Sequence, residues 1–104
     1  MLHIEIWYTG LDRSDALDNH VREQVGHELK RFSERLTRVE AYLSDENAGK
    51  GGPNDRRCVL EARPRGMEPI VVRDAGDDIF LVVRNTARKL ERALSHKFEK
   101  ADAV

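Results

Sequence analysis

The sequence contains one cysteine, one tryptophan and 6% aromatic residues, and its longest apolar run is residues 79–83. That run is far too short for a transmembrane helix, which needs about 20 apolar residues. The lone Cys58 cannot form an internal disulfide bond, which fits a reducing compartment, and we expect it to be a buried small residue. The first residues lack the basic leader and hydrophobic stretch of a signal peptide. These absences predict a soluble cytoplasmic protein with no membrane partner.

Motifs of the common enzyme classes are also absent. The chain has no P-loop, no G-x-G-x-x-G, no G-x-S-x-G and no H-E-x-x-H. The glycine-rich segment at 49–53 lacks the Lys-Ser/Thr pair and the following helix of a phosphate-binding loop, so a loop of the hairpin type is the better interpretation. The four histidines show no metal-ligand spacing. We therefore expect no enzymatic activity, no cofactor, no metal site and no small-molecule substrate.

What the chain does have is abundant charge, unevenly distributed. Its 104 residues are 39% apolar and 36% charged, typical of one compact domain spanning 1–104. The formal net charge is −1, yet residues 84–100 hold six basic and two acidic residues, and residues 50–65 hold five and two. Residues 1–49, by contrast, hold six basic and ten acidic residues. Two basic islands, at Arg56/Arg57 and near the C-terminus, thus stand in an otherwise acidic chain.

The periodicity of apolar residues predicts two helices and four strands. Alternation with period two predicts strands at 2–8, 39–45, 57–63 and 69–73, and a loop rich in turn formers at 46–55. Steps of three and four predict helices at about 14–34, capped by Ser14 or Asp12, and at 77–100, capped by Asp77 or Asp78. Gly26 inside the first helix costs roughly 1 kcal/mol relative to alanine, which suggests close packing there.

This order predicts an α+β fold, a two-layer sandwich with the element order β-α-β-β-β-α. The last three strands follow one another closely and should form an antiparallel meander. The first helix is a crossover that permits a parallel pairing of the first two strands. Each helix has one apolar side, so we expect a four-stranded mixed sheet with both helices on one face.

The second helix carries a basic side. Its apolar side comprises Ile79, Val83, Ala87, Leu90, Leu94 and Phe98. Another side comprises Arg84, Arg88, Arg92, His96 and Lys100, with Lys89 nearby. Either this side binds a polyanion, or it is a solvated surface that keeps the helix soluble. The apolar side cannot bury both Leu81 and Val82, so one of them should face outward as a contact patch or dimer interface.

Several segments together resemble one family. The pattern D-x-x-F-x-x-V at 77–83, followed by K-L-x-R-x-L at 89–94, resembles the closing helix of ribosome hibernation-promoting factors and ribosome-associated inhibitors. The S-D-A-L helix start at 14–17, the element order and the length match as well. Segments L-S-D-E at 43–46 and R-C-x-L-E-A-R-P at 57–64 look like one proteobacterial branch. The resemblance covers essentially the whole chain and is to the short form of the family.

The resemblance implies a translation regulator that binds small-subunit rRNA in the mRNA–tRNA channel and keeps idle ribosomes inactive under stress. Within the shared motif the implied rRNA-binding residues are Lys89 and Arg92. We extend this set of predicted rRNA-binding residues along the same helix to Arg84, Arg88, Lys97 and Lys100. We also include Arg56 and Arg57 from the other basic island.

The acidic first half departs from this family, whose members are usually basic. The predicted first helix region contains Asp15, Asp18, Glu23, Glu28 and Glu34. Each lost phosphate contact lowers affinity for RNA. The alternative is a protein-binding or homodimeric module on the same fold, with little or no rRNA affinity, that associates through Leu81 and Val82.

Overall fold

The computed structural model describes residues 2–46 and 55–103 and confirms the predicted order of helices and strands. A short 3-10 helix, η1, is the one addition among these residues. The elements are β1 (Ile4–Thr9), α1 (Asp15–Glu28), η1 (Lys30–Arg35), β2 (Leu36–Asp45), β3 (Arg56–Pro64), β4 (Ile70–Gly76) and α2 (Ile79–Asp102).

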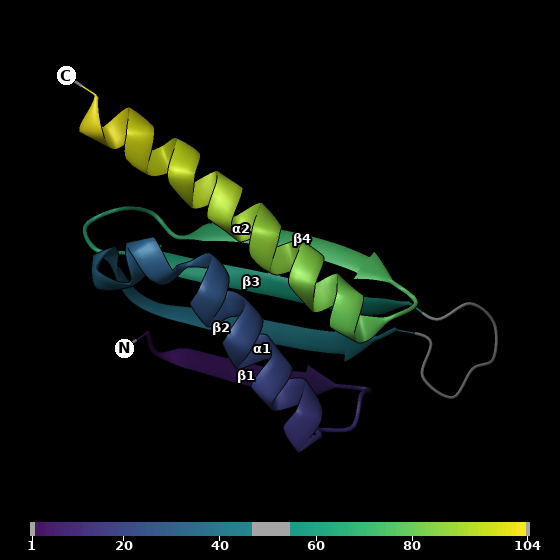
Figure 1. Ribbon diagram of the computed structural model, residues 1–104. Coiled ribbons are helices and arrows are strands. Elements are labelled where there is room, and N and C mark those ends of the chain that lie inside the picture. Colours follow the sequence, from purple (N-terminus) through teal and green to yellow (C-terminus); the bar gives the residue numbers. More distant parts are fainter. Residues whose placement is uncertain (1, 47–54, 104) are drawn as a thin grey trace.

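The four strands form one mixed sheet in the order β1-β2-β3-β4 (Figure 1). Strand β1 pairs with β2 in parallel, with Ile4 opposite Val39, while β2, β3 and β4 form the antiparallel meander. The connection from β1 to β2 runs through α1, as a parallel pairing requires.

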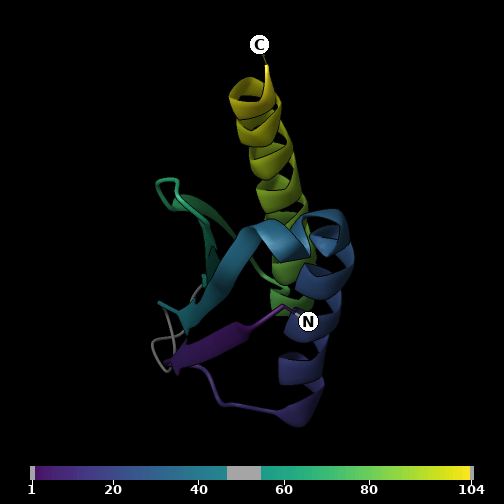
Figure 2. The same cartoon turned by 90° about the vertical axis from the view of Figure 1, so that its left-hand side faces the viewer.

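Both helices cover the same face of the sheet, and the second view shows the two layers edge-on (Figure 2). The core lies between the layers because alternate strand residues and one side of each helix are apolar. The fully buried side chains of most volume include Leu29, Leu43, Leu60, Leu90 and Leu94. No described element covers the opposite face of the sheet, which we call the open face.

The first helical segment differs from its prediction. Ser14 caps α1 by accepting a hydrogen bond from the Leu17 N–H at 3.1 Å. The α-helix ends at Glu28, and η1 continues to Arg35 where the sequence predicts one helix to about 34. Leu29 and Phe32 are both buried and lie three residues apart, the repeat of a 3-10 helix. Apolar steps of three and four do not distinguish these two helix types.

Two further predictions need correction or fall outside the described residues. A Cβ at Gly26 would meet nothing within 4 Å, so the expected close packing there is wrong. Strands β2 and β4 are longer than predicted, beginning at Leu36 and ending at Gly76 respectively. Most of the predicted loop at 46–55, including the glycine-rich segment, lies outside the described residues.

Helix α2 is long enough that its C-terminal end projects beyond the sheet (Figures 1 and 2). Two arginines of η1 hold this end. Arg35 donates two hydrogen bonds to the Asp102 carboxylate, at 3.0 and 3.2 Å, and its guanidinium lies 3.8 Å from the centre of the Phe98 ring. Arg31 donates to Glu91 at 2.8 Å and also to Ser95. These contacts fix the helix that carries the basic side.

Candidate nucleic-acid interface

The cap and the buried side of helix α2 are those that the sequence predicts. The Asp78 carboxylate accepts a hydrogen bond from the Phe80 N–H at 3.0 Å and so caps the helix. All six predicted apolar residues are buried, joined by Val82 and Thr86. Burial of this side leaves the opposite side of α2 facing away from the sheet.

Three arginines dominate the outward side. Arg84, Arg88 and Arg92 are exposed, and none forms a hydrogen bond or ion pair with any residue in the described parts of the chain. Successive members are four residues apart, so they follow one side of the helix at steps of about 6 Å. Leu81 lies at the start of this row and is 44% exposed. We call Leu81, Arg84, Arg88 and Arg92 the arginine face.

The other predicted basic residues lie elsewhere. The Lys89 ammonium is turned toward β4, where it donates to the Arg73 carbonyl at 3.0 Å and lies 3.5 Å from Asp74. Lys100 is exposed farther along α2, and Lys97 is half-buried.

The second basic island does not join the arginine face. Because side chains alternate along β3, Arg56 and Arg57 point to opposite faces of the sheet. Arg56 donates to the Asp77 carbonyl at 2.6 Å, and Arg57 pairs with Asp55 at 2.8 Å on the open face.

Beside this basic surface, α1 presents acidic residues. Asp15 and Glu23 are exposed. Asp18 is not free, because Arg22 donates to it at 3.0 Å and Tyr8 Oη at 3.2 Å. Partial burial raises the pKa of Asp18, but hydrogen bonds from Arg22, Tyr8 and Arg13 outweigh it and leave that pKa below its ordinary value. The helical layer therefore carries opposite charges on its two helices.

A small apolar patch lies where α2 begins. Phe80 is 39% exposed and packs against His20 of α1, whose Nε2 lies 2.8 Å from the Phe80 carbonyl oxygen. Of the pair expected to compete for burial, Leu81 faces outward and Val82 is in the core, 3% exposed. Val82 therefore cannot contribute to the dimer interface that the sequence suggested.

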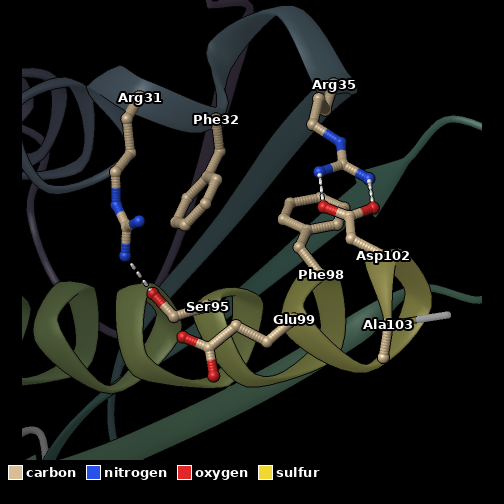
Figure 3. Close-up of a pocket in the computed structure, with 8 residues that line it drawn as sticks. All are labelled: Arg31, Phe32, Arg35, Ser95, Phe98, Glu99, Asp102 and Ala103. Carbon is tan, nitrogen blue, oxygen red and sulfur yellow. Dashed lines mark hydrogen bonds and ion pairs between the residues drawn. The ribbon is translucent and has the colours of Figure 1, made fainter.

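A cavity of about 550 Å³ opens between η1 and the end of α2 (Figure 3). Arg31 and Arg35 line it beside the rings of Phe32 and Phe98, which pack with their planes tilted by 49°. Both guanidinium groups already bond to carboxylates, Glu91 and Asp102, so the cavity offers no free cation to an anionic ligand.

The single cysteine is a core residue. Cys58 is fully buried on β3, and burial raises the pKa of its thiol to about 12. Across residues 2–46 and 55–103 no group of three or more His, Cys, Asp or Glu side chains could hold a metal ion. No helix in these ranges is long and apolar enough to cross a membrane.

Sequence reasoning missed one feature of the open face. Trp7 and Tyr42 stack there, with ring centroids 5.1 Å apart and ring planes 11° from parallel. Both occupy outward positions of their alternating strands, which was the available signal. Their adjacency depends on the register that places Trp7 of β1 opposite Tyr42 of β2.

Comparison with known structures agrees with this architecture. A ribosomal subunit interface protein from Coxiella burnetii superposes with a TM-score of 0.80 at 18% identity, covering 94% of this chain and 99% of that one. The N-terminal domain of Thermus thermophilus Protein Y superposes with a TM-score of 0.74 at 14% identity, covering 91% and 98%. At these identities the similarity establishes a shared fold. No curated protein matches the sequence.

The sequence also matches a family model described as sigma 54 modulation protein / S30EA ribosomal protein. The match spans residues 4–102, from the start of β1 to the end of α2, and therefore includes every described strand and helix. The chain belongs to the sigma 54 modulation protein / S30EA ribosomal protein family.

Proposed function

We propose that this protein is a translation inhibitor that binds small-subunit rRNA in the mRNA–tRNA channel and keeps idle ribosomes inactive. The family is ribosome-associated and non-enzymatic, so the proposed activity is occlusion of the channel and includes no chemical step. The similarity to a ribosomal subunit interface protein agrees with this role.

The observation that carries the proposal is the arginine face. Guanidinium groups donate planar pairs of hydrogen bonds that match phosphate oxygens. Arg84, Arg88 and Arg92 are available for such bonds because they are exposed and form no hydrogen bond or ion pair with the described residues, although the charge of Glu91 lies close enough to Arg92 for the two to interact. RNA helices are recognised mainly through their phosphates and shape, which a row of arginines along one side of a helix suits.

The other predicted residues contribute unequally under this proposal. Lys100 extends the row, and Lys97 borders it. Lys89 contributes less because its ammonium is turned toward β4 and already donates to the Arg73 carbonyl. Arg56 and Arg57 lie on other surfaces and contact rRNA only if the channel surrounds the protein.

Co-sedimentation with purified ribosomes and small subunits, at low and at moderate salt, tests the proposal. We expect the protein to pellet with small subunits at low salt, and a charge-reversed Arg88→Glu/Arg92→Glu variant to remain in the supernatant. A matched Glu23→Arg variant changes an exposed acidic residue of α1 and should pellet at least as well as the unmodified protein. Protein that stays in the supernatant at both salt concentrations would refute ribosome binding.

The exposed Phe80 and Leu81 favour a second candidate, a homodimeric module. In that case the protein sediments as a dimer without ribosomes, and Leu81→Glu dissociates it because the charge would be buried in the interface. A monomer at all concentrations would exclude this candidate.

A further inference from the structure

The open face of the sheet is organised in rows that run across the strands. One row holds three carboxylates, since Glu5 lies opposite Glu40 and Glu40 opposite Glu61. Like charges this close destabilise a sheet unless they are compensated. Arg38 and Arg63 supply the compensation, because an Arg38 guanidinium nitrogen lies 2.6 Å from Glu40 and one of Arg63 lies 2.8 Å from Glu61.

The next row is apolar and basic. It runs Trp7, Tyr42, Val59, Arg73 across the four strands, in register. Trp7 is 43% exposed and Tyr42 41%, although the two rings already stack on each other. The Tyr42 hydroxyl is held by a hydrogen bond to Glu40, which fixes the ring relative to the sheet. The pair is therefore a rigid aromatic surface in contact with water.

Two arginines lie near the aromatic pair, Arg73 within the same row and Arg57 in the next row away from the carboxylates. Arg73 is exposed and its guanidinium has no partner in the described parts of the chain. Together with Arg57 and Val59 it lines a hollow of about 230 Å³. Asp74 also lines the hollow, but Lys89 and the Ala75 N–H compensate its charge. Arg57 is partly compensated by Asp55, which leaves Arg73 as the free cation.

We propose that the open face binds an unpaired RNA segment, with a base stacked on the Trp7–Tyr42 pair and a phosphate bonded by Arg73. Aromatic side chains stack on exposed bases of single strands whatever their sequence, and arginine completes such sites by contacting the backbone. A duplex cannot use the aromatic pair because its bases are stacked inside. A second copy of this chain fits less well, since it would bury Arg73 without supplying a free carboxylate from the same face.

The choice of RNA as the partner rests on the proposed function, and the site lies on the opposite layer from the arginine face. The molecule is thin, with Cα dimensions of 53 × 23 × 18 Å. A channel lined by RNA would therefore meet α2 on one side and the open face on the other (Figure 2). The two surfaces would contact different RNA segments at once.

Trp7 is the only tryptophan, so its fluorescence reports on this site alone. The probe is a single-stranded oligoadenylate of about ten nucleotides, within the usual site size of such proteins. We expect saturable quenching that persists in the Arg84→Gln/Arg88→Gln/Arg92→Gln variant, because the arginine face is not involved. Duplex RNA of the same length should quench much less.

Substitutions at Tyr42, Arg73 and Val71 distinguish base stacking on the aromatic pair from other contributions to RNA binding. Loss of one base stack corresponds to a fall in affinity of about fivefold or more. We expect that loss for Tyr42→Leu, whereas Tyr42→Phe retains the ring and should bind nearly normally once circular dichroism shows that it is folded. Arg73→Gln should weaken binding, and Val71→Ala, which changes an exposed residue of the same face without an aromatic or charged group, should not.

Three results would overturn the inference. They are the absence of quenching, equal quenching by duplex RNA, and self-association abolished by Trp7→Leu, which would assign the open face to a second copy. Ribosome binding is tested separately by sedimentation. If the protein pellets with small subunits but its fluorescence is not quenched, only the open-face site is refuted. Quenching in protein that does not pellet with small subunits removes ribosome binding and leaves the single-strand site in place.

Discussion

Replacing Arg84, Arg88 and Arg92 together with glutamine should flatten the salt dependence of binding to the small subunit. These three guanidinium groups are exposed and form no hydrogen bond or ion pair with the described residues, so each is available to displace a counterion from RNA. Each neutralised phosphate contributes about 0.7–0.9 to the slope of log affinity against log salt. Loss of three contacts should therefore reduce that slope by about 2–3.

Over a fourfold rise in salt, from about 50 to 200 mM, this change in slope is large. The affinity advantage of the unmodified protein over the triple variant should shrink by a factor of about 20–40. The assay is an equilibrium titration of small subunits with labelled protein at several salt concentrations. Glutamine retains helix propensity, so the comparison reports charge with little effect on folding.

Lys89→Gln is the matched control, because its ammonium is already bonded to the Arg73 carbonyl and lies near Asp74. Its effect on the slope should be clearly smaller than one third of the triple variant's effect. Parallel salt plots for the unmodified protein and the triple variant would refute the assignment of phosphate contacts to the arginine face.

Two further predictions concern stability. Gly26→Ala should raise the free energy of unfolding by about 0.5–1 kcal/mol and Tm by a few degrees, since a Cβ there meets nothing within 4 Å; a lower Tm would contradict the open space at this position. The hydrogen bond from Tyr42, helped by Arg38 and Arg63 against the opposing effect of burial, lowers the pKa of Glu40 below its ordinary value of 4.5. A lowered pKa stabilises the folded state above about pH 4.5, and that stabilisation is lost as pH falls through the folded pKa. Glu40→Gln should therefore be less stable than the unmodified protein at pH 7 and lose less stability on acidification, as denaturant titrations at several pH values will measure; equal losses would contradict this role of Glu40.

The fold was predictable because its signals are periodic and local. Alternation in the strands and steps of three and four in the helices gave the element order, the mixed sheet and the buried side of α2. The end of α1 was not predictable, because Leu29 and Phe32 fit an α-helix and a 3-10 helix equally well. The open space around Gly26 was not predictable either, since packing density depends on neighbours that are distant in sequence.

The candidate site was predictable in part. The sequence places Arg84, Arg88 and Arg92 on one side of a helix, and the structure shows them exposed. The sequence could not show that Lys89 is turned toward β4, because that orientation depends on a contact between α2 and a strand edge. The Trp7–Tyr42 pair escaped prediction for a related reason: a stack across two parallel strands follows from their register, which no local pattern specifies.

The formal net charge of −1 is a weak argument against binding to a polyanion, for reasons of distance. Packed helices lie about 8–10 Å apart, which is close to the Debye length of about 8 Å at physiological ionic strength. A phosphate at the arginine face is therefore partly screened from Asp15 and Glu23 of α1. At about 0.01 M salt the Debye length is about 30 Å, and the same phosphate interacts with the whole molecule. Long-range attraction to RNA should consequently be weak, while contact through α2 remains favourable.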